Sequence, residues 1–120
     1  MYVRAIRGAI TVDKNDSEEI INASAELLEK IIDENKIDHE DIISVIFSVT
    51  KDLNAAFPAV GARRIGLTQV ALFCTNEIDV PGSLEMCIRV MVHINTEKKN
   101  SELKHVYLKG ASVLRPDLNL

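Results

Sequence analysis

The sequence predicts an α+β fold, and two observations lead to this prediction. Segments with the two-residue periodicity of strands outnumber helical segments. Their order is strand, helix, strand, helix and then three strands, which lacks the regular alternation of an α/β protein. The chain has 120 residues and shows no internal repeat and no linker, so we expect a single domain over residues 1–120. With 47% apolar and 27% charged residues, its composition is close to that of an average soluble domain.

Composition also limits the classes of function. No apolar run approaches the roughly 18 residues of a membrane span, and Arg4 and Arg7 interrupt the first apolar stretch. We therefore expect neither a membrane partner nor a signal peptide. Two cysteines without a secretory signal favour reduced thiols and a cytoplasmic location. The net charge of −4 and the scarcity of aromatic residues disfavour a nucleic-acid partner.

Charge is distributed unevenly along the chain. Residues 1–41 contain eleven acidic and five basic residues, a net charge of −6. Residues 42–120 contain seven acidic and nine basic residues, a net charge of +2. The positive net charge of residues 42–120 is compatible with a basic pocket for a small carboxylate or phosphate ligand. A domain of this size buries a modest fraction of its surface, so we also expect an oligomer.

The first expected element is a strand over residues 2–12. Its alternation places Val3, Ala5 and Arg7 on one face, and Gly8 permits a bend or a bulge. An arginine that shares a face with small apolar residues is compatible with an edge strand at the rim of an interface.

A long helix is expected next. Asp16 is its N-cap, with Glu19 three residues later as in a capping box, and a broad apolar stripe runs to a stop at Asn35. The acidic residues outside the stripe indicate a solvated face. A second short helical start is expected at residues 38–41. His39 is interpreted there as a turn residue, because no second His or Cys lies at metal-binding spacing.

The rest of the chain is divided between strands and loops. Pro58 suits the first turn of a short helix that ends near Gly66. We expect strands over residues 42–50, 68–74, 87–95 and 105–108, loops over 51–58, 75–83 and 97–103, and an extended or turn-like end at 115–117.

Two arginines inside strands are the unusual feature of this sequence. Arg7 and Arg89 each stand among apolar neighbours. An arginine offers a planar fork of donors and stays charged, so two of them with Tyr107 would suit a small polyanionic ligand. A structural ion pair of Arg89 with Glu77 or Asp79 explains Arg89 nearly as well.

Common catalytic motifs do not occur in the sequence. There is no glycine-rich phosphate loop, no HExxH and no CxxC, so we expect neither a metal nor an organic cofactor. A thiol nucleophile built from Cys74 or Cys87 with His93 or His105 has no supporting pattern, and a buried structural cysteine is the commoner state.

Six segments together resemble the monofunctional chorismate mutases of the α+β class. They occur in the same order as in that family, and the resemblance covers nearly the whole chain. Each segment alone is a weak signal, but together they are specific. They are Ile6-Arg7-Gly8-Ala9 with Thr11-Val12, residues 52–59 (DLNAAFPA), 76–80 (NEIDV), 87–91 (CIRVM), 105–108 (HVYL) and 113–118 (VLRPDL).

This resemblance implies an isomerase that converts chorismate to prephenate on the route to phenylalanine and tyrosine. It also implies a homotrimer that forms a pseudo-α/β barrel, with a mixed β-sheet inside and helices outside. Three active sites would then lie in clefts between subunits, and chorismate would be the small-molecule partner.

The resemblance further implies roles for individual residues. Arg89 would contact the ether oxygen and a carboxylate, and Arg7 would bind a carboxylate with support from Tyr107. Glu77 would accept a hydrogen bond from the substrate hydroxyl. Further residues would line the site: Leu72, Phe73 and Cys74 in the pocket, Phe57, Ala59 and Arg63 from the neighbouring chain, and Leu114 and Arg115 where the site closes.

Three positions depart from the family pattern. Val60 stands where relatives can carry a lysine, the segment from Arg63 to Gly66 is one residue short, and a family tryptophan is replaced near Leu67. Either Arg63 or Arg64 could therefore supply the neighbour's basic contact. Two other functions stay open at this point: a trimeric imine deaminase of similar architecture, and a trimer that binds its ligand without turning it over.

Overall fold

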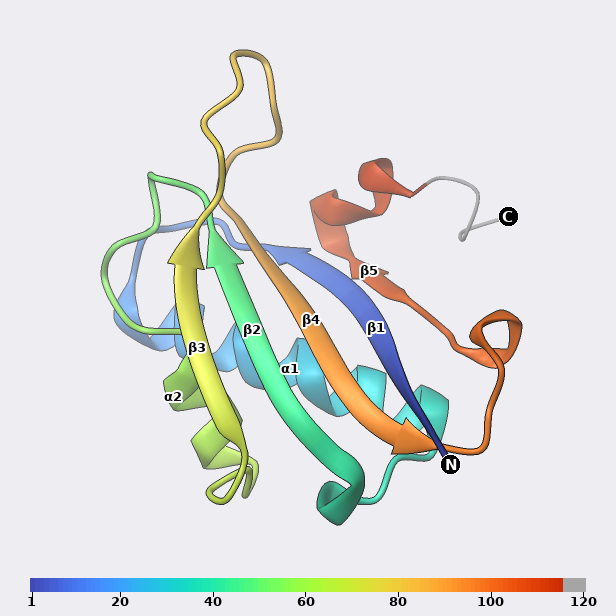
Figure 1. The fold of residues 1–120 in the computed structure, drawn as a ribbon. Coiled ribbons are helices and arrows are strands. Elements are labelled where there is room, and N and C mark those ends of the chain that lie inside the picture. The colour runs from blue at the N-terminus through green and yellow to red at the C-terminus, as the bar shows by residue number, and fades with distance from the viewer. Residues whose placement is uncertain (116–120) are drawn as a thin grey trace.

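Five strands form one mixed sheet with the order β3-β2-β4-β1-β5 (Figure 1). The structure, a computed structural model, describes residues 1–115. Strand β4 pairs antiparallel with both β1 and β2, while β5 runs parallel to β1 and β3 runs parallel to β2. The α+β class with a mixed sheet is thus confirmed. The strands are β1 (Tyr2–Thr11), β2 (Ile42–Val49), β3 (Ala71–Asn76), β4 (Cys87–Thr96) and β5 (Val106–Leu108).

Both α-helices, α1 (Ser17–Asn35) and α2 (Ala59–Arg64), lie on the same side of the sheet, behind it in Figure 1. The predicted cap of α1 is confirmed, because the Asp16 carboxylate accepts a hydrogen bond from the Glu19 backbone N–H. The helix ends at Asn35, and Lys36 follows in the left-handed conformation. None of the helices within residues 1–115 is long and apolar enough to cross a membrane.

Of the bend or bulge permitted at Gly8, no bulge occurs, and the first strand is not an edge strand of the sheet. Strand β1 pairs with β4 without interruption, and over Gly8–Ile10 it lies between β4 and β5. A Cβ atom on Gly8 would lie 2.7 Å from the carbonyl oxygen of Val106 and 2.9 Å from Cδ1 of Ile31. Gly8 therefore allows strand β5 and helix α1 to approach the backbone closely. The irregular register occurs instead in β2, between Ile42 and Ser44.

Two other segments differ from expectation. Strand β3 begins at Ala71 rather than at Thr68, because the Leu67 and Thr68 N–H groups bond back to Ala62 and Gly66 in the turn after α2. After β5, residues 109–114 form a 3₁₀ helix that the sequence pattern did not predict. Of the end expected at residues 115–117, Pro116 and Asp117 lie outside the described residues.

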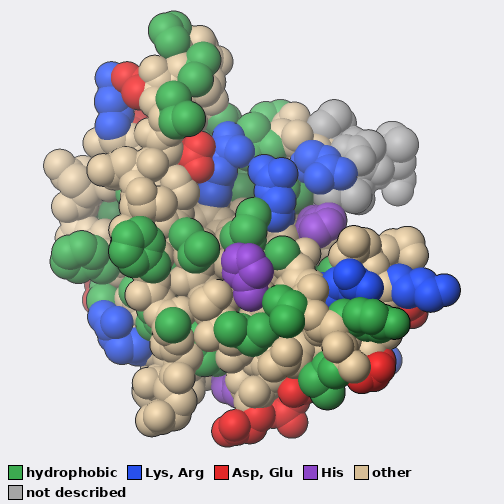
Figure 2. Space-filling model, in the orientation of Figure 1, with side chains coloured by type: hydrophobic (Ala, Val, Ile, Leu, Met, Phe, Trp, Pro, Cys, Tyr) green, Lys and Arg blue, Asp and Glu red, His purple; other side chains and the backbone are tan. Residues whose placement is uncertain are grey.

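Among residues 1–115 of the single chain, much of the sheet face opposite the helices is uncovered. Val3 of β1 is 60% exposed and Phe73 of β3 is 66% exposed, and Ile46 of β2 is also exposed between them. Figure 2 shows hydrophobic and histidine side chains across this face, and basic side chains gathered at one end of it. This open face carries the candidate site.

Candidate functional site

One row of residues crosses the open face from β5 towards β3. Ala9 of β1 lies opposite Tyr107 of β5 on one side and Arg89 of β4 on the other. Ser48 of β2 continues the row beyond Arg89. Neighbouring strands lie about 4.8 Å apart, so the small, buried Ala9 side chain separates the phenol from the guanidinium. The strand pairing thus brings two predicted site residues together.

Arg7 and Arg115 add positive charge beside this row. Arg7 precedes Ala9 by two residues, so it shares the open face and lies diagonally across from Arg89. Burial lowers the pKa of His105, and the positive charges of Arg115 and Arg7 lower it further. Within residues 1–115, the Arg7 side chain forms no ion pair or hydrogen bond.

Glu77 supplies the carboxylate next to Arg89. It follows β3 directly, and its backbone N–H donates to the Val49 carbonyl at 2.9 Å, which fixes it at the end of the sheet. Its Oε2 lies 3.6 Å from Nε of Arg89, close enough for an ion pair but too long for a hydrogen bond. The two side chains are 27% and 29% exposed, so solvent screens the pair only in part.

Two buried donors at this site have no hydrogen-bond partner among residues 1–115. They are Nε of Arg89 and the hydroxyl of Tyr107. Nearly all buried polar groups in folded proteins are hydrogen-bonded, and an unpartnered one costs about 1–3 kcal/mol. Both groups belong to the row described above, beside Arg7. An anion with several oxygen acceptors would satisfy them and balance the excess positive charge.

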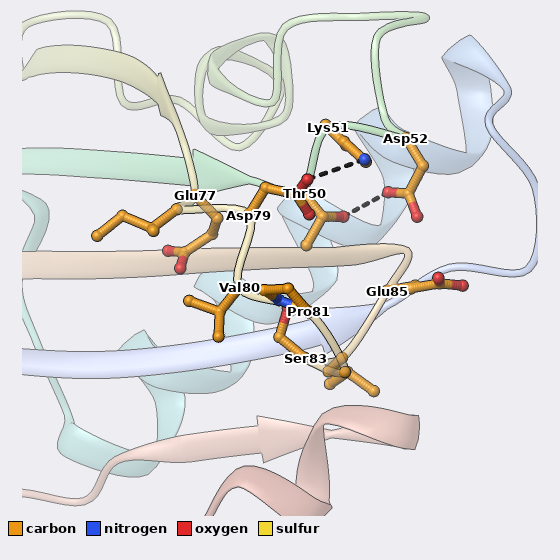
Figure 3. A pocket seen from close by; sticks show the side chains of 12 residues that line it. Thr50, Lys51, Asp52, Glu77, Asp79, Val80, Pro81, Ser83 and Glu85 are labelled. Atoms are coloured by element: carbon orange, nitrogen blue, oxygen red, sulfur yellow. Dashed lines mark hydrogen bonds and ion pairs between the residues drawn. The ribbon is translucent and has the colours of Figure 1, made fainter.

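The loop over residues 77–85 borders a cavity of about 500 Å³ next to Glu77 (Figure 3). Residues 50–52 line its other side. Within the loop, Asp79 turns to Lys51, with 2.8 Å between Oδ2 and Nζ, while Glu77 pairs with Arg89. The two loop carboxylates therefore have different partners and do not form an acid–base dyad. Of the two ion pairs considered for Arg89, the structure contains the one with Glu77.

The other predicted residues of the pocket lie apart from this cluster. Cys74 lines a hollow of about 410 Å³ with residues 53–58, and Phe57 stands 71% exposed at it. Ser48 and Thr75 are paired on the open face, so strand alternation turns Cys74 to the other side of the sheet. Leu72 and Cys74 both pack against the core there, whereas Phe73 stays on the open face.

Helix α2 presents the basic residues of this second group. Ala59 is buried in its first turn. Both terminal guanidinium nitrogens of Arg64 donate to the Glu18 carboxylate at 3.1 Å, and this contact lowers the pKa of Glu18. Arg63 forms no ion pair or hydrogen bond within residues 1–115. Arg63 is therefore the arginine of α2 that is available for a ligand, while Arg64 is engaged on α1.

Leu114 belongs to the first group. It packs against a small buried cluster that contains Ala9, Cys87 and Tyr107. Leu114 therefore adjoins the row across the open face, and Arg115 follows it in the chain. The structure thus divides the predicted residues into an open-face set (Arg7, Glu77, Arg89, Tyr107, Leu114 and Arg115) and an edge set around α2 and β3 (Phe57, Ala59, Arg63, Leu72 and Cys74).

Sequence reasoning missed two contacts of the site. Lys51, which holds Asp79, was assigned only to a loop, and its spacing gave no signal. His105 was placed in the last strand and in a segment that carries the family resemblance, but no role at the site was predicted for it. In the structure its Nδ1 accepts a hydrogen bond of 2.9 Å from the Arg7 backbone N–H. Its place two residues before Tyr107, on the same side of the chain, is the signal that could have found it.

The thiols argue against nucleophilic catalysis. Both cysteines are free, and Cys87 is fully buried beside Ala9. Burial raises the pKa of the Cys87 thiol to about 11, although the nearby Arg89 opposes this shift. The thiolate is the reactive form, so Cys87 stays protonated and inert near neutral pH.

We expect one thiol per chain to react with a disulfide reagent at pH 8 under native conditions. Cys74 should react because it lines an open hollow, whereas Cys87 should react only after unfolding. The measurement is the release of chromophore, with C74S as the variant that should abolish the native reaction. Two fast thiols, or fast labelling of C74S, would contradict the burial of Cys87.

No group of three or more His, Cys, Asp or Glu side chains that could hold a metal ion occurs within residues 1–115. The donors that do converge at the site are guanidinium and phenol groups. This donor set suits the oxygen atoms of an anion.

Comparisons with known proteins show which family this chain resembles. Residues 3–118 match the family described as chorismate mutase type I. The chain is 46% identical to a chorismate mutase of Bacillus subtilis over 121 residues, which span 100% of this chain and 95% of the relative. It is 49% identical to that of Thermus thermophilus over 117 residues, or 97% and 96% of the two chains.

A solved structure is similar as well. The chorismate mutase from Clostridium thermocellum superposes with a TM-score of 0.90 at 57% sequence identity, and the match covers 92% of this chain and 98% of that one. Since the family match spans nearly every residue and the relatives are similar over their whole lengths, this chain belongs to the chorismate mutase type I family.

Proposed function

We propose that this protein converts chorismate to prephenate in sites that are completed between copies of the chain in a cytoplasmic homotrimer. Membership of the family supports the reaction. The observation that carries the assignment of the site is a pair of buried donors, on Arg89 and Tyr107, that have no hydrogen-bond partner among residues 1–115. Beside them lies the Arg7 side chain, which forms no ion pair or hydrogen bond within the same residues. Such a cluster suits a substrate with two carboxylates, an ether oxygen and a hydroxyl group.

The division of the predicted residues supports an assembly. Arg89 points to the open face and Cys74 to the helix side, so one chain cannot bring its two sets of residues together. A neighbouring copy that packs on the open face would cover the exposed side chains of Val3 and Phe73. The same contact would place its edge set, with Phe57 and Arg63, beside the first chain's arginines.

The reaction requires restraint and charge stabilisation from the protein. It is an intramolecular rearrangement in which a carbon–oxygen bond breaks while a carbon–carbon bond forms. Arg7, and Arg63 from the neighbour, would hold the carboxylates and so keep the flexible dianion compact. Glu77 would accept the hydrogen bond of the substrate hydroxyl. Each of these contacts exists in both the ground state and the transition state.

Arg89 would have a different task. As the ether bond stretches, negative charge develops on its oxygen, and a fixed donor aimed at this atom stabilises the transition state more than the ground state. Its guanidinium is held in the sheet by the strand register and by the ion pair with Glu77. Because it is already in place, little reorganisation is needed during the reaction.

The rate of the chemical step should change little between about pH 6 and pH 9. No proton is transferred in the rearrangement, and arginine and an ordinary carboxylate keep their charges in this range. The loss of chorismate absorbance at saturating substrate measures this rate, with the amount of prephenate as the check on the product. A bell-shaped profile inside this range would favour acid–base chemistry. Absence of chorismate turnover would favour the deaminase or the ligand-binding trimer.

A further inference from the structure

We propose that His105 is a positioning residue that holds Arg7 in place to bind the substrate carboxylate. This inference rests on the function proposed above. His105 lies immediately before β5, on the strand that carries Tyr107, and has no role in the rearrangement itself. It therefore acts through another residue, and the contact that transmits its effect is its hydrogen bond with the backbone of Arg7.

The hydrogen bond between His105 and Arg7 lies at the point where the pairing of β1 with β5 ends. Strands β1 and β5 pair only over Gly8–Ile10, and Arg7 is the first residue of β1 beyond this ladder. The N–H of Arg7 donates to Nδ1 of His105 at 2.9 Å. The imidazole thus provides the acceptor that a longer β5 would have provided. Because Nδ1 accepts this bond, the ring proton must be on Nε2, a tautomer assigned here from the hydrogen bond.

Charged groups approach the ring from three elements. Arg7 comes from β1 and Arg115 from the end of the chain, and both lower the pKa of His105, after burial as the largest cause. On the side of α1, Lys30 and Glu34 line a hollow of about 380 Å³ with His105 and Lys104. Lys30 and Glu34 form an ion pair with each other, with 3.2 Å between Nζ and Oε1. The surroundings therefore favour the neutral ring that can accept the bond.

Protonation of His105 would remove the acceptor and place a charge beside two arginines. The sign of the stability effect follows from the lowered pKa. The contribution of His105 to the free energy of unfolding is complete at pH values above 6.5, the ordinary pKa of histidine. This contribution is lost as the pH falls from 6.5 towards the lower pKa of the folded state. In the enzyme we expect the same step as a rise in KM as the pH falls below the ordinary histidine value of 6.5, because the carboxylate contact of Arg7 is loosened.

The test compares H105N with H105L. The Oδ1 atom of asparagine can take the place of Nδ1 as an acceptor but does not titrate, whereas leucine fills similar space without an acceptor. We expect H105L to raise KM roughly fivefold at pH 7.5, the effect of one lost hydrogen bond, with kcat changed less than twofold. H105N should keep a KM near the wild-type value at pH 7.5 and should lack the rise of KM at acidic pH.

Several outcomes would overturn the proposal. They are a wild-type KM in H105L, an acid rise of KM that persists in H105N, or a loss confined to kcat. Melting temperatures of both variants show whether they are folded, and if H105L is not, the pH profile of H105N decides alone. A wild-type protein that does not consume chorismate would instead refute the proposed function. The two failures are therefore distinguishable.

Discussion

Replacing Arg89 with alanine should lower kcat by at least about 100-fold, because one oriented donor to a developing negative charge contributes about 3 kcal/mol or more to transition-state stabilisation. The guanidinium lies in the row that crosses the open face, and its Nε is buried without a hydrogen-bond partner among residues 1–115. It is therefore preorganised for an acceptor that arrives with the substrate. The loss should fall on kcat more than on KM.

Two further substitutions separate the contributions of charge and shape. R89K keeps a positive charge but loses the planar fork of donors, so it should recover only part of the activity. R7A should instead raise KM strongly, since a carboxylate contact is shared by the ground state and the transition state. R4A is a matched control on the same strand, because Arg4 bonds the Lys98 carbonyl at 3.1 Å and stacks over Tyr2, away from the site.

The ion pair with Glu77 provides the competing explanation. If Arg89 only anchored the loop over residues 77–85 through its 3.6 Å contact, R89A would lower the melting temperature and leave the turnover of the folded enzyme near normal. Partly exposed ion pairs of this length contribute little to stability, so we expect only a small change in melting temperature. Measuring melting temperature with kcat and KM distinguishes the explanations. A folded R89A enzyme with near-normal kcat would refute the proposed role.

Local signals in the sequence were enough to predict most elements. The N-cap at Asp16 and the stop at Asn35 depend on contacts within one turn of helix, and the structure has both. The alternation in residues 87–95 predicted β4, which is paired on both sides. The 3₁₀ helix over residues 109–114 was missed, because such a short element has no apolar period of its own.

Contacts between distant segments could not be predicted in this way. The role of Gly8 depends on β5 and α1, which approach it from far along the chain. The pairing of Ala9 with both Arg89 and Tyr107 follows from strand order, which periodicity does not specify. The sequence pattern singled out Arg89 and Tyr107 as candidates for an anion site, but their individual roles came from the resemblance to a family. The bond between His105 and Arg7 joins residues 98 positions apart, so neither periodicity nor local spacing could predict it.

Mixing two inactive variants should restore activity if each site takes residues from two chains. R89A removes the open-face arginine, and R63A removes the available arginine of α2, which should weaken carboxylate binding and leave little activity at low substrate concentration. The structure places these residues on different elements, and Cys74 of the second set faces the opposite side of the sheet from Arg89. Only a neighbouring chain can then complete a site.

The expected recovery follows from random assembly of a trimer. In a closed three-fold ring, a site is intact when one chain supplies a normal Arg89 and its neighbour supplies a normal Arg63, which at equal amounts occurs in about a quarter of sites. R89A and R63A, unfolded and refolded together, should therefore reach about a quarter of the activity of wild-type protein treated in the same way.

A second mixture makes the result specific to an intersubunit site. R89A and R7A both alter the open-face set, so no arrangement of these two chains contains an intact site, and their mixture should show no gain. Sedimentation or native mass measurements must show a trimer in every sample. Recovery in the first mixture alone would support sites shared between neighbours. Equal activities of the two mixtures, or a fully active monomer, would refute the shared site, because each chain would then hold all of its catalytic residues on its own.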